Sequence, residues 1–360
     1  MRKYYPAEMS NARAEMYRSG ELPKPIDQLK KALHSTAETR SKIPVKDAVV
    51  HWFRGDLRVF DNTALHMASL KAQSNGASLI TLFLVSPQDY EAHITSPARV
   101  DFILRTLEVL RNDLDKLDIP LWVEAIEDRN GTANRVLSLM QQWNVNHIYG
   151  NVEYEVDELR RDARIVKMAA KTNIDFNVVH DIMIAPPGAL VTKSTGKPFT
   201  VFTPWFNAWV AYLHENPKFL DLHPPPHKNP SVTRTKYKDL FFCPVPPCPE
   251  PKKLDTEELN YIRSIWPAGE QEASTRLKKF LDAKITEYKD RRDFPAGGGT
   301  SLLSVHFATG TLSSRTAIHR AREVNGNGLK SGNKGIVCWI SEVGWREFYR
   351  NVLINFPWVW

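Results

Sequence analysis

Short apolar runs alternate with amphipathic segments through the first half of the chain. Ala48–Phe53 and Ser78–Val85 are mostly apolar and lack helical spacing, as strands buried on both faces of a parallel sheet do. Val100–Leu117 carries apolar residues at steps of three and four, which predicts an amphipathic helix. The same reasoning predicts strands at Leu121–Ala125, His147–Gly150 and Phe176–Val179, and helices at Asp61–Ala72, Thr132–Trp143 and Val156–Ala170. This alternation predicts a doubly wound α/β domain over residues 46–185.

The second half of the chain is predicted to be helical after a long connection. Residues 216–251 are crowded with proline, including Pro224–Pro226. Because proline fixes its φ angle and lacks an N–H, this segment predicts a wrapping linker, which we place at residues 186–256. Helical patterns occur at Thr203–His214, Glu270–Ala283, Ser313–Val324 and Gly335–Ile354.

The net charge and the cysteine content limit the kinds of binding partner and the cellular compartment that the sequence predicts. The formal net charge of +7 favours an anionic partner, either nucleic acid or a membrane surface. No run of about twenty apolar residues occurs, so no membrane span is predicted. The three cysteines, Cys243, Cys248 and Cys338, do not form a disulfide framework, which predicts a reducing compartment, and we expect no metal site.

The first 45 residues form a basic segment in which acidic residues are interleaved. A transit peptide is poor in acidic residues, so this composition favours a flexible N-terminal extension. An organelle signal stays open as the alternative.

A glycine-rich loop precedes a predicted helical turn. Gly297–Gly299 is followed by Thr300, Ser301 and Ser304, and Tyr288, Arg291 and Arg292 lie just upstream. Unobstructed backbone N–H groups and hydroxyls before a helix bind phosphate without needing a lysine. A flexible glycine loop with a hydroxyl N-cap is the alternative, and the loop alone does not decide between them.

One later segment, Cys338–Tyr349, places several binding side chains on neighbouring turns of a helix. Glu342 lies three residues before Trp345 and four before Arg346, so the three can share a face. An aromatic plane beside a carboxylate and a cation suits a flat, hydrogen-bonding, anionic ligand such as a nucleotide. A surface ion pair beside a core tryptophan is the alternative reading.

Taken in order, these segments resemble the DNA photolyase/cryptochrome family over about 310 residues from Val50. The shared motifs are WFRGDLRVFDNTAL at Trp52–Leu65, EYKDRRDFP, GTSLLS, HFATGTLSSR and WISEVGWREFY. The resemblance implies an α/β antenna domain, a long linker and an all-α FAD- and DNA-binding domain. Residues 257–360 would be the N-terminal part of that last domain.

The resemblance implies a role for individual residues. Tyr288 and the stretch Thr300, Ser301, Leu302, Leu303 and Ser304 match positions that hold the phosphates and ribitol of FAD. Arg346 matches a residue that reaches toward the flavin and lesion pocket. Trp345 matches the indole that stacks on a flipped pyrimidine dimer, and Glu342 matches the carboxylate that binds its bases. Trp339 matches a second aromatic at the pocket rim, and Arg292 is assigned to the same lesion-binding group.

The implied function is light-dependent repair of cyclobutane pyrimidine dimers, by electron transfer from excited FADH⁻ to the flipped-out dimer. Glu342 favours this lesion, because (6-4) photolyases and animal-type cryptochromes usually carry Gln at that position. A (6-4) photolyase or a blue-light cryptochrome is the alternative. Family members continue beyond the position of Trp360, so a C-terminally truncated, non-catalytic fragment that retains little FAD is a further alternative.

The second chromophore and the cellular setting are less narrowly implied. Asp157 and Glu158 match a segment that contacts a methenyltetrahydrofolate antenna in some members, although Asn is common at the first position. A deazaflavin antenna, or no antenna, is an open alternative. Glu158 can equally be an acidic residue at a helix N-terminus, where the helix dipole favours a negative charge. The expected partner is ultraviolet-damaged DNA, bound by a monomer without a membrane. The nucleus is the expected location, with mitochondrion and cytoplasm as alternatives.

Overall fold

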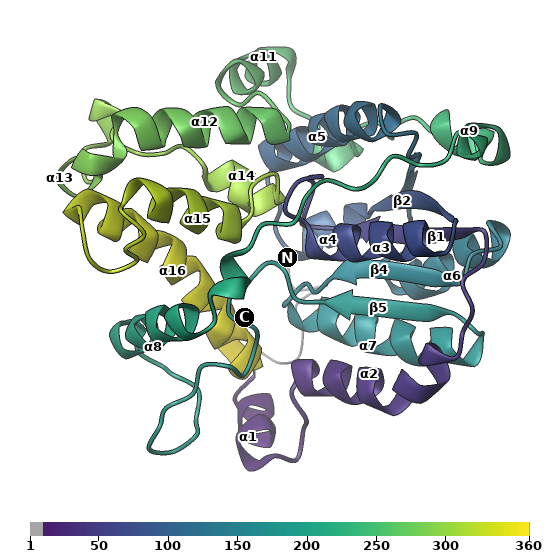
Figure 1. Ribbon diagram of the computed structural model, residues 1–360, viewed down its shortest axis with the longest axis horizontal. Helices are drawn as coiled ribbons and strands as arrows, with labels where there is room; N and C mark the ends of the chain where they lie inside the picture. The colour runs from purple at the N-terminus through teal and green to yellow at the C-terminus, as the bar shows by residue number, and fades with distance from the viewer. Residues whose placement is uncertain (1–9, 360) are drawn as a thin grey trace.

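Five parallel strands form one sheet in the α/β half of the molecule (Figure 1). The computed structural model describes residues 10–359. The strands are β1 (Ala48–Phe53), β2 (Ser78–Val85), β3 (Leu121–Ala125), β4 (His147–Asn151) and β5 (Asp175–Val179), hydrogen-bonded in the order β3-β2-β1-β4-β5. The chain builds outward from one side of β1 and then from the other, which is a doubly wound topology and confirms the predicted fold class.

Both faces of the sheet are covered by helices, which explains the apolar strands. Val50 and Trp52 of β1 point into a core with α6 (Thr132–Gln142) and α7 (Val156–Lys171). Val49 and Phe53 point to the other face. That face is covered by α3 (Thr63–Ser74) and α5 (Pro97–Asp115), while the short α4 (Pro87–Ala92) follows β2. Because successive side chains alternate between faces, a strand buried on both sides needs apolar residues at almost every position.

The N-terminal segment does not form the flexible extension that its composition predicts. Beyond the first nine residues, which lie outside the described part, it folds into α1 (Asn11–Ser19) and α2 (Pro25–Ser41). Helix α2 lies along α7 (Figure 1) and buries Ile26, Leu29 and Ala32 in the sheet core. Its Arg40 Nη1 donates to Asp175 Oδ1 at 2.8 Å. Apolar residues at helical spacing therefore outweigh the basic composition here.

The segment that we place as a linker, residues 186–256, contains helices. Helix α8 (Phe202–Glu215) packs in the core of the helical half, and the proline-rich part holds α9 (Val232–Lys236) and α10 (Lys238–Phe241). Asn229 in the linker receives a hydrogen bond from Leu79 N at 2.7 Å and donates to Leu79 O at 2.8 Å. Proline excludes long helices and ladders, yet single turns fit between the prolines.

The remaining chain is helical, and its helices α13 and α15 pack against α16 (Figure 1). Its helices are α11 (Thr256–Ile265), α12 (Glu270–Ala283), α13 (Tyr288–Arg291), α14 (Ser304–Thr309), α15 (Ser314–Val324) and α16 (Lys334–Asn355). Single 3₁₀ turns occur at η3 (Arg129–Gly131), η4 (Pro217–Leu220), η5 (Glu250–Lys252), η6 (Ile285–Glu287), η7 (Pro295–Gly297) and η8 (Pro357–Val359). Trp205 and Trp209 of α8 are fully buried in this second core.

A buried ionic cluster joins the two halves of the molecule. Asp61 precedes α3 and accepts from Arg315 Nε at 2.6 Å and from Thr316 Oγ1 at 2.8 Å, both on α15. Asp181, just after β5, receives Arg315 Nη2 at 2.8 Å and also pairs with Arg58. Asn62, rather than Asp61, is the N-cap of α3. The Asp61 carboxylate is therefore available for the contact between the two halves.

Gly310 shows how closely the two halves approach. Its φ is +74°, and a Cβ built there would lie 2.2 Å from Gly55 O and 2.4 Å from Asp56 Cα. Both the left-handed conformation and the contact require glycine. The C-terminal end of α14, capped by Gly310, is therefore held against the first β–α turn of the sheet.

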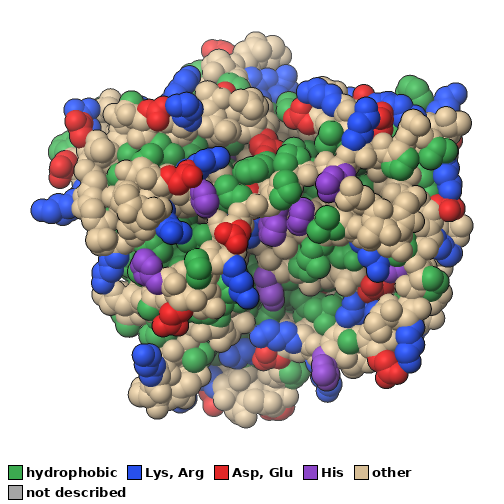
Figure 2. Space-filling model, in the orientation of Figure 1, with side chains coloured by type: hydrophobic (Ala, Val, Ile, Leu, Met, Phe, Trp, Pro, Cys, Tyr) green, Lys and Arg blue, Asp and Glu red, His purple; other side chains and the backbone are tan. Residues whose placement is uncertain are grey.

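Among residues 10–359 no helix is both long and apolar enough to cross a bilayer. Figure 2 shows one face, on which Lys and Arg side chains spread mainly around the edge while hydrophobic and His side chains cross the middle.

Candidate functional site

The carboxylate that the sequence singles out on α16 is held by an arginine from another helix. Glu342 and Arg292 form an ion pair, and about one third of each side chain is exposed. Arg292 also donates to Cys338 Sγ at 3.5 Å. The hydrogen bond that Arg292 donates to Glu342 raises the pKa of Arg292 above its ordinary value, so the guanidinium stays charged. Glu342 thus presents a fixed carboxylate at the surface of the helical half.

Tyr288 and Trp339 lie behind this pair rather than at a rim. The Arg292 guanidinium lies 5.7 Å from the Tyr288 ring centroid, and Tyr288 meets Phe280 edge to face. Trp339 is only 3% exposed and its ring centroid lies 5.3 Å from that of Phe280. The expected rim position of Trp339 is therefore not what the structure shows, because its side of α16 faces the core formed with α12.

Trp345 and Arg346 lie one turn further along α16 and contact different helices. The Trp345 ring stacks on Phe202 of α8 with centroids 3.7 Å apart and an angle of 10°. Trp345 stays partly exposed. Arg346 donates to Phe307 O on α14 and lies over the Phe307 ring. Arg346 therefore ties the helix that carries Glu342 to the segment that follows the glycine-rich loop.

The glycine-rich loop has the free donors that a phosphate needs. The backbone N–H groups of residues 299–303 donate no hydrogen bond to any other part of the described chain. Leu302 has a φ of +52°, and α14 starts without a side-chain cap. A Cβ at Gly299 would lie 2.8 Å from Arg291 O, so glycine is required there.

The predicted FAD-binding residues therefore fit the phosphate part of that cofactor. Thr300 and Ser301 are half-buried and Ser304 is exposed, whereas Leu303 is buried and can offer only its backbone. Tyr288 lies under Arg292 at the start of α13, which precedes this loop in the chain. Uncapped N–H groups and hydroxyls converge on one loop, as anion sites at helix starts do.

Glu347 fixes the position of α16. Its carboxylate is fully buried and accepts from Ile184 N at 2.8 Å and from Trp209 Nε1 at 2.9 Å. Burial raises the pKa of Glu347 to about 7, against the opposing effect of these hydrogen bonds. The helix that carries Glu342 and Trp345 is thus joined to α8 and to the end of the α/β half.

We expect Glu347→Gln to remove part of the pH dependence of stability. The folded-state pKa of about 7 lies above the ordinary 4.5, so the carboxyl's contribution to stability is fully present below 4.5 and is lost as the pH rises through 7. Glutamine does not ionise, so the variant should lose less stability than the parent between about pH 5 and about pH 8. Denaturant unfolding at both pH values measures this, and equal pH dependence in parent and variant would contradict it.

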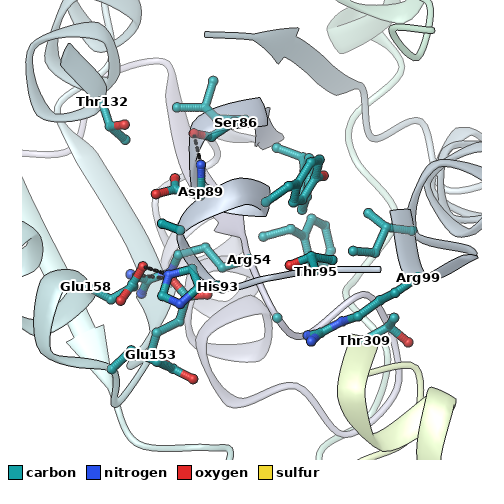
Figure 3. A pocket seen from close by; sticks show the side chains of 18 of the residues that line it. Arg54, Ser86, Asp89, His93, Thr95, Arg99, Thr132, Glu153, Glu158 and Thr309 are labelled. Atoms are coloured by element: carbon teal, nitrogen blue, oxygen red, sulfur yellow. Dashed lines mark hydrogen bonds and ion pairs between the residues drawn. The ribbon is translucent and has the colours of Figure 1, made fainter. Parts of the chain in front are cut away.

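A cavity of about 600 Å³ opens at the carboxyl edge of the sheet (Figure 3). Its lining includes Arg54 after β1, Ser86 after β2 and Glu153 after β4, with Thr309 of α14 on the opposite side. β1 lies between β2 and β4, where the strand order changes direction. Doubly wound sheets bind ligands at this crevice. The cavity therefore lies where the two halves of the molecule meet.

Glu158 lines this cavity and contacts a histidine that the sequence reasoning passed over. His93 Nε2 lies 2.9 Å from Glu158 Oε1. Although burial alone would lower it, Glu158 raises the pKa of His93 to about 9. Burial opposes the shift in Glu158 too, but His93 lowers its pKa to about 2. Glu158 also lies in the first turn of α7. Its position is therefore compatible with a contact to an antenna chromophore and with an acid at a helix N-terminus, the two roles that the sequence leaves open.

Reasoning from the sequence missed residues whose contact partners lie far away along the chain. Arg58 and Arg315 lie in shared motifs and Asp181 does not, but only the structure shows that the three are buried together. His93 follows α4, whose Ser86 cap and Pro87 start are a readable helix signal. His51, His147 and His306 are buried.

Comparison with known proteins identifies proteins of similar sequence. A family model described as DNA photolyase matches residues 49–228. The chain is 50% identical over its whole length to a deoxyribodipyrimidine photo-lyase of Neurospora crassa, covering 59% of that protein. It is 30% identical over 99% of its length to a mitochondrial deoxyribodipyrimidine photo-lyase of Saccharomyces cerevisiae, covering 65% of it. The chain thus spans about three fifths of the length of the curated relatives it matches.

Solved structures share the fold. A class III photolyase from Agrobacterium tumefaciens matches with a TM-score of 0.68 at 23% identity, over 87% of this chain and 60% of that one. A cryptochrome from Synechocystis matches with a TM-score of 0.66 at 19% identity, over 87% and 62%. An archaeal photolyase from Sulfolobus tokodaii, described with two FAD molecules, matches with a TM-score of 0.55 at 20% identity, over 85% and 59%. At these identities the likeness supports the architecture alone.

Proposed function

Because this chain belongs to the DNA photolyase family, we propose that it takes part in light-dependent repair of cyclobutane pyrimidine dimers in DNA. The observation that carries the proposal is the half-exposed face of α16, where Glu342 is fixed by Arg292 and Trp345 follows one turn later. The relatives named as deoxyribodipyrimidine photo-lyases support the same substrate. A flavin-dependent lyase activity follows from this assignment.

The side chains on this face suit a flipped-out dimer. Trp345 is backed on one side by Phe202, which stiffens the indole as a stacking surface. Each stacked base contributes about 1–3 kcal/mol, enough to offset much of the cost of flipping a weakly paired step. Glu342 accepts hydrogen bonds from the N–H groups of the bases, while Arg292 keeps the carboxylate in place. Recognition then depends on the damage and not on the sequence.

We assign the FAD phosphates to the loop that includes Thr300 and Ser304, with Tyr288 and Arg346 beside it. FAD, when bound and reduced, supplies the excited-state electron that opens the cyclobutane ring. The residues of this chain orient the two partners. Arg346 brings a positive charge to the helix that follows the loop, because it donates a hydrogen bond to Phe307 O in α14.

A second, light-harvesting chromophore is proposed for the cavity at the carboxyl edge of the sheet. The cavity is large enough for a planar cofactor, and Glu158, matched to the antenna segment of some family members, lines it. Ile103 and Tyr90 add an apolar wall, and Arg54 and Arg161 supply charge. A folate and a flavin-like chromophore both suit this lining. We further propose that the protein acts as a monomer on nuclear or mitochondrial DNA.

Disrupting the gene that encodes this chain should abolish the loss of cyclobutane dimers from genomic DNA under blue light. Antibodies against cyclobutane dimers and against (6-4) products, applied to light-treated and dark-treated cells, measure each lesion separately. The parent gene should restore the light-dependent loss, whereas Glu342→Ala should restore little of it. Glu323→Gln, a surface change on α15, is the matched control that should restore it fully.

Two results would contradict the proposal. Light-dependent dimer loss that is unchanged in the disrupted strain removes the repair role. A defect confined to (6-4) products supports the (6-4) photolyase alternative, and a defect in light responses with intact repair supports a cryptochrome.

A further inference from the structure

Three metal-ligating side chains meet at the mouth of the cavity. Asp89 lies on α4 and His93 follows four residues later, so both face the same side. Glu158 comes from the first turn of α7. One ligand atom of each residue lies within 4.8 Å of those of the other two. Figure 3 shows His93 and Glu158 in contact, with Asp89 above them and all three on the cavity wall.

The contact between His93 and Glu158 leaves part of the carboxylate unexplained. Glu158 is only 7% exposed, and its Oε1 is used by His93 at 2.9 Å. Its Oε2 is buried and has no hydrogen-bond partner within the described chain. Buried carboxylate oxygens almost always have a partner, so an unmatched one beside a histidine and a second carboxylate points to a bound ligand.

Arg129 holds the Asp89 carboxylate in position. Arg129 Nε bonds Asp89 Oδ1 at 2.7 Å, and Arg129 Nη2 bonds Asp157 Oδ2 at 3.1 Å. A charge-paired carboxylate can still offer its second oxygen to a metal ion, and outer contacts of this kind orient metal ligands. Asp157 also balances the positive charge that Arg129 brings close to the cluster.

We propose that Asp89, His93 and Glu158 bind one divalent transition-metal ion, with Zn²⁺ preferred among the common cellular ions. One imidazole and two carboxylates are typical Zn²⁺ ligands, whereas Mg²⁺ and Ca²⁺ prefer oxygen alone. Ligand atoms around tetrahedral Zn²⁺ lie roughly 3.3 Å apart, as metal–ligand bonds of about 2.0 Å require. The cluster therefore needs only a slight opening of the His93–Glu158 contact and an approach of Asp89.

An ion at this place would have one coordination position open to the cavity. A molecule in the cavity with a carbonyl, carboxylate or phosphate oxygen could complete the coordination. The site shares Glu158 and the cavity with the second chromophore proposed above. It does not depend on the repair function, because none of its three residues belongs to the α16 face that carries that proposal.

Metal binding by the untagged, chelator-treated 360-residue chain tests the site directly. Co²⁺ titration followed by visible absorption, and Zn²⁺ titration followed by calorimetry, should show one saturable site per chain. His93→Ala and Glu158→Gln should each weaken binding by at least about tenfold. The matched control is His319→Ala. His319 Nε2 lies 3.4 Å from Glu323 Oε1, and these two residues are four apart along the chain, as Asp89 and His93 are. That control should bind the metal as the parent does.

Circular dichroism shows whether each variant is folded, and Glu158→Gln preserves side-chain volume in case His93→Ala disturbs α4. The proposal is overturned if the parent chain shows no saturable site. It is also overturned if both variants bind as tightly as the parent, or if a thiolate-to-cobalt absorption band shows that cysteines hold the ion.

Discussion

Asp181→Asn is expected to lower the free energy of unfolding by about 3–5 kcal/mol. Asp181 is 1% exposed and accepts from Arg315 Nη2 at 2.8 Å and from Thr63 Oγ1 at 2.6 Å, besides its ion pair with Arg58. Although burial alone would raise it, the two guanidinium groups hold the pKa of Asp181 well below its ordinary value. The carboxylate is therefore charged in the folded protein at neutral pH.

The size of the effect follows from what the substitution leaves behind. Asparagine keeps the shape but removes the negative charge. Buried Arg315 then keeps Asp61 as its carboxylate partner, whereas buried Arg58 keeps only its hydrogen bonds to the backbone carbonyls of Asp61 and Gly310. Breaking one side of a buried ion pair costs more than the pair contributes, because the remaining charge is desolvated and poorly compensated. Since Arg315 lies on α15 and Asp181 follows β5, the contact between the two halves should weaken most.

Urea unfolding followed by tryptophan fluorescence and by circular dichroism measures the change. The matched control is Asp115→Asn, which removes an exposed carboxylate 3.0 Å from Arg234 and should change stability by less than about 1 kcal/mol. A loss in Asp181→Asn as small as in the control would show that the cluster does not stabilise the contact between the halves.

Trp345→Ala is expected to weaken binding of DNA that contains a cyclobutane dimer by about 1–3 kcal/mol, which is roughly five- to 150-fold. This expectation rests on the proposed repair function. The indole is partly exposed and supported from behind by Phe202, so its removal takes away the stacking surface without opening the inner core. Undamaged DNA is held mainly through phosphates, so its affinity should change little.

Fluorescence anisotropy at one fixed salt concentration compares damaged with undamaged oligonucleotides. Trp345→Phe should recover most of the lost affinity, because a phenyl ring still stacks. Trp143→Ala is the control, since Trp143 is also half-buried but lies at the end of α6, where it packs on Trp122. A Trp345→Ala protein that discriminates damaged DNA as well as the parent does would remove this residue from the lesion site.

Local sequence patterns were sufficient for the elements and for part of the site. Each strand lies within one residue of its predicted bounds, because burial on both faces requires a continuous apolar run. The shared face of Glu342, Trp345 and Arg346 follows from helical spacing alone. The resemblance to a family was carried by the same residues, and the comparisons confirm it.

Long-range partners could not be read in this way, because spacing within an element says nothing about what packs against it. Trp339 shares the helix with Trp345, yet the core formed with α12 buries it. The N-terminal segment has a basic composition, but α7 offers an apolar surface on which α2 folds.

The sequence by itself therefore determined the five strands, the helices that alternate with them, and the candidate site residues on the glycine-rich loop and on α16. Only the tertiary structure decided that Arg292 holds Glu342, that Asp61 and Asp181 join the two halves, and that His93 meets Glu158 at the cavity. These pairings are between 50 and 254 residues apart along the chain. Their contact depends on how the linker and loops bring separate elements together, and no local periodicity records that.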